Sequence, residues 1–130
     1  GTMGYALPAA MGAKIAAPDK QVVAVCGDGG FQMTMQELAT ITQYQIPVKL
    51  VILKNTVLGL VRQYQHYNYK DRFSVIDLGD KPDLSMIAKA YGIEYLKVEN
   101  SRQADEKIAA FLEKDETMIL EVTVDREELC

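Results

Sequence analysis

The chain lacks the features that mark several large classes of protein. No apolar run approaches the about 18 residues that a membrane span needs, and the first residues have neither the basic start nor the apolar core of a signal peptide. Lys and Arg number 14 against 18 Asp and Glu, which leaves a net charge of −4 and no basic stripe. We therefore expect a cytoplasmic protein with no membrane span and no nucleic-acid partner.

Cysteine and histidine are also scarce. Cys26 and Cys130 form no CxxC or zinc-ligand spacing, and Cys26 lies in an apolar run, which is typical of a small core residue. His66 is the only histidine, and no Ser or Cys nucleophile motif accompanies it. These observations argue against redox chemistry and favour an ordinary surface or groove position for His66.

The composition is that of a packed globular domain. The chain has 130 residues, which is the size of one domain. Of these residues 48% are hydrophobic and 25% charged, and this composition excludes a disordered or fibrous protein. Strand and helix patterns alternate along it. Strands are predicted over 21–26, 48–53, 94–98 and 117–124, and helices over 4–17, 34–45, 57–69, 83–91 and from 101 to about 112.

This alternation predicts an α/β fold with an open, mainly parallel sheet and helices on both faces. The apolar run over 21–26 is typical of a strand buried on both faces. Thr34 and Glu37 are spaced as a capping box, Asp83 is expected to begin a helix, and Ser101 is expected to cap one. Gly92 suits the left-handed position after a helix. Residues 72–82 have no clear period and predict an irregular loop.

Polar residues follow the first two predicted strands directly. Gly27-Asp28-Gly29-Gly30 comes after one, and Lys54-Asn55 after the next. A right-handed crossover brings both strand ends to the same edge of a sheet, where ligands bind. The oxygens of Asp28 and Asn55 suit magnesium or calcium, and Gly29 and Gly30 let backbone N–H groups approach an anion.

Each motif also has a simpler interpretation. A Gly-Asp-Gly-Gly after a strand can be only a tight turn, and an isolated Asn can be only a helix cap. Their placement at matching ends of consecutive strands favours a site for a metal and a phosphate group.

The same residues carry a family resemblance. Gly27-Asp28-Gly29, followed after 25 residues by Asn55, resembles the signature of thiamine-diphosphate enzymes, in which GDG precedes a pair of Asn; Lys54 replaces the first Asn of that pair. Residues 1–10, 30–34, 37–38, 47–49, 58–63 and 119–122 are similar to acetolactate synthase catalytic subunits. The resemblance covers nearly the whole chain and implies the thiamine-diphosphate-binding fold.

The resemblance also implies roles for individual residues. Asp28 and Asn55 would bind magnesium through side-chain oxygens and Val57 through its backbone carbonyl. Gly29 and Gly30 would contact the diphosphate, and Met3 would hold thiamine in its bent form. The implied cofactor-binding set is Gly1, Met3, Asp28, Gly29, Gly30, Asn55, Val57, Gly59 and Leu60. Tyr64 stands where acetolactate synthases often show a Trp that favours 2-oxobutyrate as acceptor, so it is the implied specificity residue.

The resemblance implies that residues 1–130 form most of the C-terminal cofactor domain of a larger transferase of branched-chain amino acid biosynthesis. That enzyme would decarboxylate pyruvate and condense the product with a second 2-oxo acid. In this family the cofactor is shared between two subunits, and the activating Glu comes from the partner's pyrimidine-binding domain. We therefore expect a homodimer or higher oligomer with a possible regulatory subunit, no catalytic residue within 1–130, and no activity from the chain alone.

Three alternatives remain open. The enzyme could be a glyoxylate carboligase or a sulfoacetaldehyde acetyltransferase, since related thiamine-diphosphate enzymes share much of the signature. The domain could also be a non-catalytic homologue. The sequence leaves the acceptor and the strand order open as well.

Overall fold

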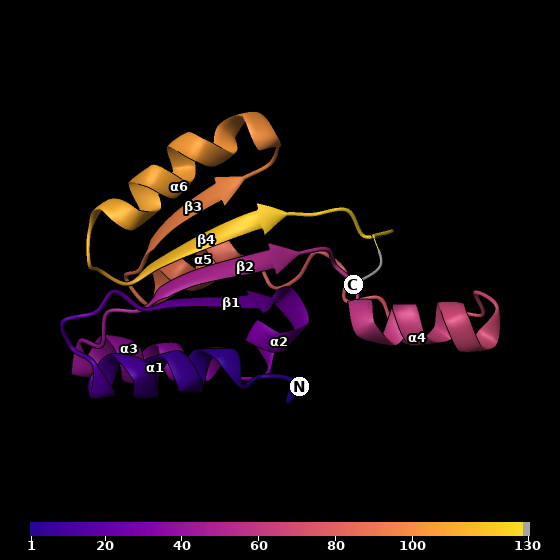
Figure 1. Ribbon diagram of the computed structural model, residues 1–130, viewed down its shortest axis with the longest axis horizontal. Helices are drawn as coiled ribbons and strands as arrows, with labels where there is room; N and C mark the ends of the chain where they lie inside the picture. Colours follow the sequence, from indigo (N-terminus) through magenta and orange to yellow (C-terminus); the bar gives the residue numbers. More distant parts are fainter. Residues whose placement is uncertain (129–130) are drawn as a thin grey trace.

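The chain forms a parallel sheet with helices on both faces, which confirms the predicted α/β fold (Figure 1). The structure is a computed structural model and describes residues 1–128. The strands are β1 (Val23–Gly27), β2 (Lys49–Lys54), β3 (Glu94–Val98) and β4 (Met118–Thr123). The helices are α1 (Ala6–Ala16), α2 (Asp28–Gln32), α3 (Leu38–Tyr44), α4 (Gly59–Tyr69), α5 (Leu84–Ala90) and α6 (Ala104–Glu113), with short 3₁₀ turns η1 (Met35–Glu37) and η2 (Ser101–Gln103).

The strands pair in the order β1-β2-β4-β3, all parallel. Gly27 at the end of β1 lies opposite Leu53 near the end of β2. The carboxyl ends of the strands therefore share one edge of the sheet, and the segments that follow β1 and β2 start side by side. None of the helices in the described part of the chain is long and apolar enough to cross a membrane.

Two apolar clusters cover the two faces of the sheet. Helices α1, α3 and α5 pack on one face, where Leu7, Leu38 and Leu84 join the sheet residues Leu50 and Ile52. Helix α6 packs on the other face (Figure 1). Its Phe111 clusters there with Met118 and Leu120 of β4. The larger cluster fixes α1 and α2 beside the end of β1, where the predicted site begins.

The prediction that the first strand is buried on both faces was wrong. Ala24 is buried, but Val23 and Val25 on the opposite face are 42% and 57% exposed. Helix α6 lies over β3 and β4 instead, and among residues 1–128 no helix covers that face of β1. A run of apolar residues indicates a strand, but it does not say which faces the neighbouring elements reach.

Two predicted helix caps were also wrong. The Thr34 side chain makes no cap, because its hydroxyl donates to the Gly4 carbonyl at 3.1 Å. The 3₁₀ turn η1 followed by the helix α3 replaces the single helix over 34–45. Asn100, rather than Ser101, accepts from the Arg102 amide. Both expectations relied on spacing alone, and tertiary contacts decided otherwise.

Other local predictions are confirmed. Asp83 caps α5 by accepting from the Ser85 and Met86 amides, and Gly92 follows that helix with a positive φ of 67°. Residues 72–82 are irregular, apart from a single bridge between Asp77 and Val57. Cys26, expected to be a core residue, is a free thiol that is only partly buried against the core, and Cys130 lies outside the described residues.

Two lysines are buried, one with hydrogen-bond acceptors for its amine and one without. Lys14 donates from Nζ to the Lys20 carbonyl and to Asp115, both at 2.8 Å. Lys49 is 1% exposed; its Nζ has no hydrogen-bond partner in the described structure and lies 5.2 Å from the centre of the Phe111 ring. Burial lowers the pKa of Lys49, because the charged amine has lost water without gaining an acceptor.

We predict that Lys49→Met stabilises the protein at neutral pH by about 1 kcal/mol, because the apolar stem stays and the buried charge goes. Because the pKa of Lys49 is lower in the folded protein, the unfolded chain binds this proton more readily. Wild-type stability therefore rises as the pH approaches 10.5, the ordinary pKa of a lysine. The advantage of Met therefore shrinks in alkali. Denaturant unfolding across this range checks both statements.

The matched control is Lys14→Met, which removes two hydrogen bonds and is expected to destabilise the protein by about 1 kcal/mol. A loss of stability in Lys49→Met at neutral pH would contradict the assignment of Lys49 as an uncompensated buried charge.

Candidate cofactor site

A cavity of about 750 Å³ opens at the carboxyl edge of the sheet, between the ends of β1 and β2, the N-terminal segment and the start of α4. It brings together the whole cofactor-binding set that the resemblance implied. Its lining includes Gly1, Met3, Asp28, Gly29, Gly30, Asn55, Val57, Gly59 and Leu60. These residues come from three separate stretches of chain, so the fold rather than local sequence assembles them.

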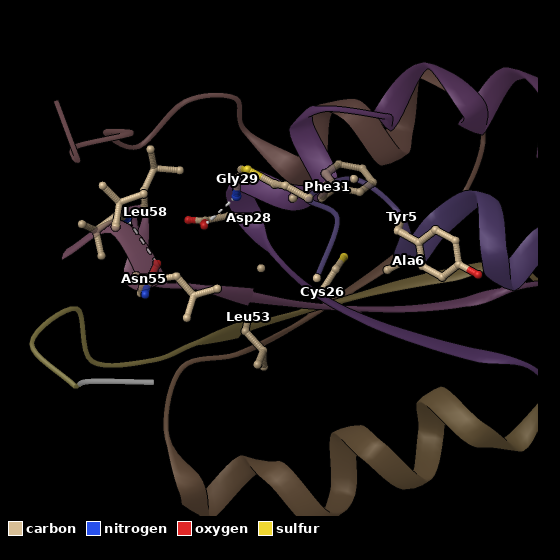
Figure 2. Close-up of a pocket in the computed structure, with 18 of the residues that line it drawn as sticks. Tyr5, Ala6, Cys26, Asp28, Gly29, Phe31, Leu53, Asn55 and Leu58 are labelled. Atoms are coloured by element: carbon tan, nitrogen blue, oxygen red, sulfur yellow. Dashed lines mark hydrogen bonds between the residues drawn. The ribbon is translucent and has the colours of Figure 1, made fainter. Parts of the chain in front are cut away.

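Asp28 joins the ends of the two neighbouring strands. One carboxylate oxygen accepts from the Gly29 amide and the other from the Thr56 amide, both at 2.8 Å. Thr56 has a positive φ of 61°, which turns the chain after β2 toward Asp28. Figure 2 shows the carboxylate directed toward the segment that carries Asn55 and Leu58. Asp28 is 6% exposed, so this carboxylate is held in place before any ligand binds.

The segment after β2 is fixed from two sides. The Asn55 side-chain oxygen accepts from the Val57 amide at 3.2 Å. The irregular loop supports the same turn, because the Leu58 amide donates to the Ile76 carbonyl at 2.8 Å and the Leu78 amide to the Thr56 carbonyl at 2.9 Å. The potential ligands Asp28 and Asn55 thus sit on a preorganised backbone.

Gly29 lies at a crowded point of the cavity wall. A Cβ added there would lie 3.0 Å from the Met3 methyl carbon and 3.1 Å from methyl carbons of Leu58 and Leu78. A Cβ at Gly30 would meet only the Gly4 nitrogen, at 3.9 Å. The Gly29 amide already donates to Asp28, so its use toward a bound anion, which the sequence suggested, would require sharing that hydrogen.

The donor chemistry fits a hard divalent cation. Asp28 and Asn55 supply a carboxylate and an amide oxygen, and each oxygen that accepts one amide keeps lone-pair capacity for a metal. None of the lining residues that the structure describes is Lys or Arg. Asp125 and Glu128 line the cavity as well, a placement that the sequence did not indicate, because they follow the distant strand β4.

Three other residues considered from the sequence are also located. Cys26 lines the cavity, and burial and the Asp28 charge raise the pKa of its thiol to about 11, so it is not a nucleophile at neutral pH. His66 lies near the end of α4, where it pairs with Asp71. Tyr64 lies outside the cavity lining and is 58% exposed, with its ring 5.9 Å from that of Tyr69.

Lys54, which stands in place of an expected Asn, does not line the cavity. Its Nζ lies 3.7 Å from the carboxylate of Glu121, which is 3% exposed and accepts from the Tyr95 hydroxyl at 2.8 Å. Burial and this hydrogen bond raise the pKa of Tyr95. Lys54 therefore compensates a buried charge beside the site.

Comparison with known families agrees with this geometry. A family model described as "Thiamine pyrophosphate enzyme, C-terminal TPP binding domain" matches residues 1–122. The chain belongs to this family. The predicted cofactor, thiamine diphosphate, is thereby confirmed, and magnesium is the usual partner metal of the family.

Individual relatives of this TPP-binding domain are acetolactate synthases. One from Arthrospira platensis is 47% identical, with 100% of this chain aligned to 23% of the relative. The large subunit from Lactococcus lactis subsp. lactis is 43% identical over 98% of this chain and 22% of its own length. The chain thus spans less than a quarter of the curated relatives it matches.

A solved structure shows the same fold. The thiamine diphosphate-dependent 4-hydroxybenzoylformate decarboxylase of Rhodococcus jostii RHA1 superimposes with a TM-score of 0.87 and 29% identity. The match covers 97% of this chain and 24% of that one.

The glycine contacts generate a prediction for this TPP-binding domain. Gly29→Ala is expected to lower the free energy of unfolding by about 1–2 kcal/mol, because three packed side chains must move to admit the methyl group. Gly30→Ala, the matched control, meets no close atom and is expected to change stability by less than about 0.5 kcal/mol. Chemical denaturation of both variants checks the difference, and equal stabilities would show that Gly29 is not constrained by packing.

Proposed function

We propose that this chain is the diphosphate- and magnesium-binding part of an enzyme that decarboxylates pyruvate and condenses the product with a second 2-oxo acid, as an acetolactate synthase does. The observation that supports it is the convergence of the whole implied cofactor set on one cavity, together with 40–47% identity to acetolactate synthases. In this proposal residues 1–130 form most of the enzyme's C-terminal domain, and the other domains of the enzyme lie outside these residues.

The chain's own residues would bind and orient the cofactor. Asp28 and Asn55 would hold magnesium through side-chain oxygens, with the Val57 carbonyl as a third ligand. Gly29 and Gly30 would lie against the diphosphate, Gly1, Gly59 and Leu60 would line its pocket, and Met3, whose methyl group lies above Gly29, would support the thiamine ring. Thiamine diphosphate, when bound, supplies the electron sink for decarboxylation.

Magnesium has an electrostatic role in this proposal. The cavity offers Asp28, Asp125 and Glu128 to a ligand that is itself anionic, and no Lys or Arg among its described lining residues. Like charges disfavour such binding unless a cation lies between them. Cofactor binding is therefore expected to depend strictly on a divalent cation.

The proposal also places a second subunit at the cavity. Leu60 and Tyr5 line it yet are 70% and 68% exposed, so an apolar part of the wall faces outward. A partner domain that covers this wall would exclude water from the reacting carbon and supply the activating Glu. We therefore propose a homodimer or higher oligomer in the cytoplasm, with 2-oxo acids as substrates, and expect no turnover from residues 1–130 alone.

A second candidate function is decarboxylation without condensation. The fold match to a 4-hydroxybenzoylformate decarboxylase favours it, although that match has 29% identity. Product analysis of the full-length protein with pyruvate separates the two: acetolactate supports the first candidate, and acetaldehyde as the sole product supports the second.

Asp28→Ala in the full-length protein is expected to weaken magnesium-dependent binding of thiamine diphosphate by about a hundredfold or more, because it removes the anionic ligand. It also leaves two backbone amides without their acceptor, at a cost of about 1–3 kcal/mol in stability. Asp28→Asn removes the charge and keeps one of the two acceptor oxygens, so its loss of stability is expected to be smaller than that of Asp28→Ala.

Calorimetric titration with and without magnesium checks this expectation. Asp19→Ala is the control, because Asp19 is exposed and precedes β1 at the opposite edge of the sheet. Unchanged cofactor affinity in both Asp28 variants would remove Asp28 from the metal site.

Tyr64→Trp is expected to raise the preference for 2-oxobutyrate over pyruvate as acceptor. Leu60 lines the cavity and Tyr64 follows one turn later on the same side of α4, so a larger ring there extends the apolar wall. Competition between the two acceptors, read as a product ratio, measures the change. Tyr44→Trp, at an exposed position at the end of α3, is the control. An unchanged ratio in Tyr64→Trp would exclude Tyr64 as a specificity residue.

A further inference from the structure

Helix α4 is attached to the rest of the structure in an unusual way. It extends beyond the carboxyl ends of the strands (Figure 1). Its apolar residues are turned outward, with Leu60, Tyr64 and Tyr67 between 58% and 70% exposed. Within α4, all of which the structure describes, Arg62 is the one buried residue. Apolar packing therefore does not fix the position of this helix.

Arg62 reaches the segment that follows β4. Its Nη1 donates to the Glu127 carbonyl at 2.9 Å, and its Nη2 pairs with the carboxylate of the same residue. The guanidinium also lies over the Phe73 ring, 5.1 Å from its centre, which adds a cation–π contact. The planar guanidinium makes both bonds at once, which a Lys ammonium in the same place cannot match in geometry.

The two chain segments that this pair joins are both walls of the cavity. Val61, next to Arg62, lines it, and so do Asp125 and Glu128 on either side of Glu127. Arg126 forms a second link in the same segment by pairing with Asp77, whose backbone bridges to Val57. The Arg62–Glu127 pair therefore joins two segments that each contribute neighbouring residues to the cavity wall.

We propose that Arg62 and Glu127 are positioning residues, which hold α4 against the segment 124–128 and so set the width of the cavity on the side of Leu60 and Val61. The effect on substrate choice rests on the function proposed above, whereas the attachment of α4 does not. Arg62 is not itself in the cavity lining, so it acts through the helix that carries it.

The attachment is tested by hydrogen exchange, resolved along the chain, in the full-length protein without cofactor. Arg62→Met is expected to raise exchange at the α4 amides by about tenfold, because local opening no longer breaks the two bonds. Glu127→Gln, which keeps the carbonyl acceptor, is expected to give a smaller rise, and the double variant no more than Arg62→Met alone. Exchange in α6 is expected to stay unchanged.

Arg102→Met is the matched control, because Arg102 is an exposed arginine in η2, distant in the sequence from α4. Unchanged exchange in α4 of Arg62→Met overturns the attachment, and so does an equal rise in Arg102→Met. A rise in α4 with partial recovery in Arg62→Lys supports it.

The second readout is steady-state kinetics of the loaded full-length enzyme with pyruvate and 2-oxobutyrate. A displaced wall is expected to change KM and the acceptor ratio by about threefold or more while kcat changes less, with partial recovery in Arg62→Lys. Faster exchange in α4 with unchanged KM and acceptor ratio overturns the positioning role. A wild-type protein that forms no acetolactate contradicts the proposed function instead, and the exchange result then decides the attachment by itself.

Discussion

The hydrogen bond from the Thr56 amide to the Asp28 carboxylate is the contact on which the cavity depends. Parallel pairing of β1 with β2 brings the two strand ends to one edge, but pairing alone leaves the following segments free to diverge. The 2.8 Å hydrogen bond holds the two segments together, and the positive φ of Thr56 directs its amide toward Asp28. The same carboxylate that would bind the metal therefore also holds the turn that carries Asn55 in place.

The electrostatics of the site follow from the same arrangement. Diphosphate sites often use Lys or Arg, but the described lining of this cavity holds carboxylates, neutral polar groups and apolar side chains. Its nearby cations are engaged elsewhere: Lys54 and Lys97 face the buried Glu121, and Arg62 faces Glu127. The chain thus keeps fixed positive charge away from the cavity and leaves the charge balance there to a bound ion.

The sequence predicted the parts of the structure that local patterns determine. Strand runs, the Asp83 cap, Gly92 and the meeting of Asp28 with Asn55 each follow from residue type and spacing. The exposed side of β1, the bond from Thr34 to Gly4, the partner of Lys54 and the place of Asp125 and Glu128 depend on elements far away in the chain. The periodicity of apolar residues along the chain does not predict such long-range contacts. Tyr64 remains a prediction, because its side chain lies outside the cavity lining and is largely exposed.

The strand order has a consequence for how this sheet can form during synthesis. Strand β4 follows the other three strands of residues 1–128 in the sequence, yet it lies between β2 and β3 and pairs with both. Until residues 118–123 have been made, β2 has one neighbour and β3 has none within the sheet. Chains are made from the amino end and long-range parallel pairing is slow, so the sheet closes late. A nascent chain halted before β4 would expose the apolar edges of both strands and is the species that a chaperone would be expected to bind.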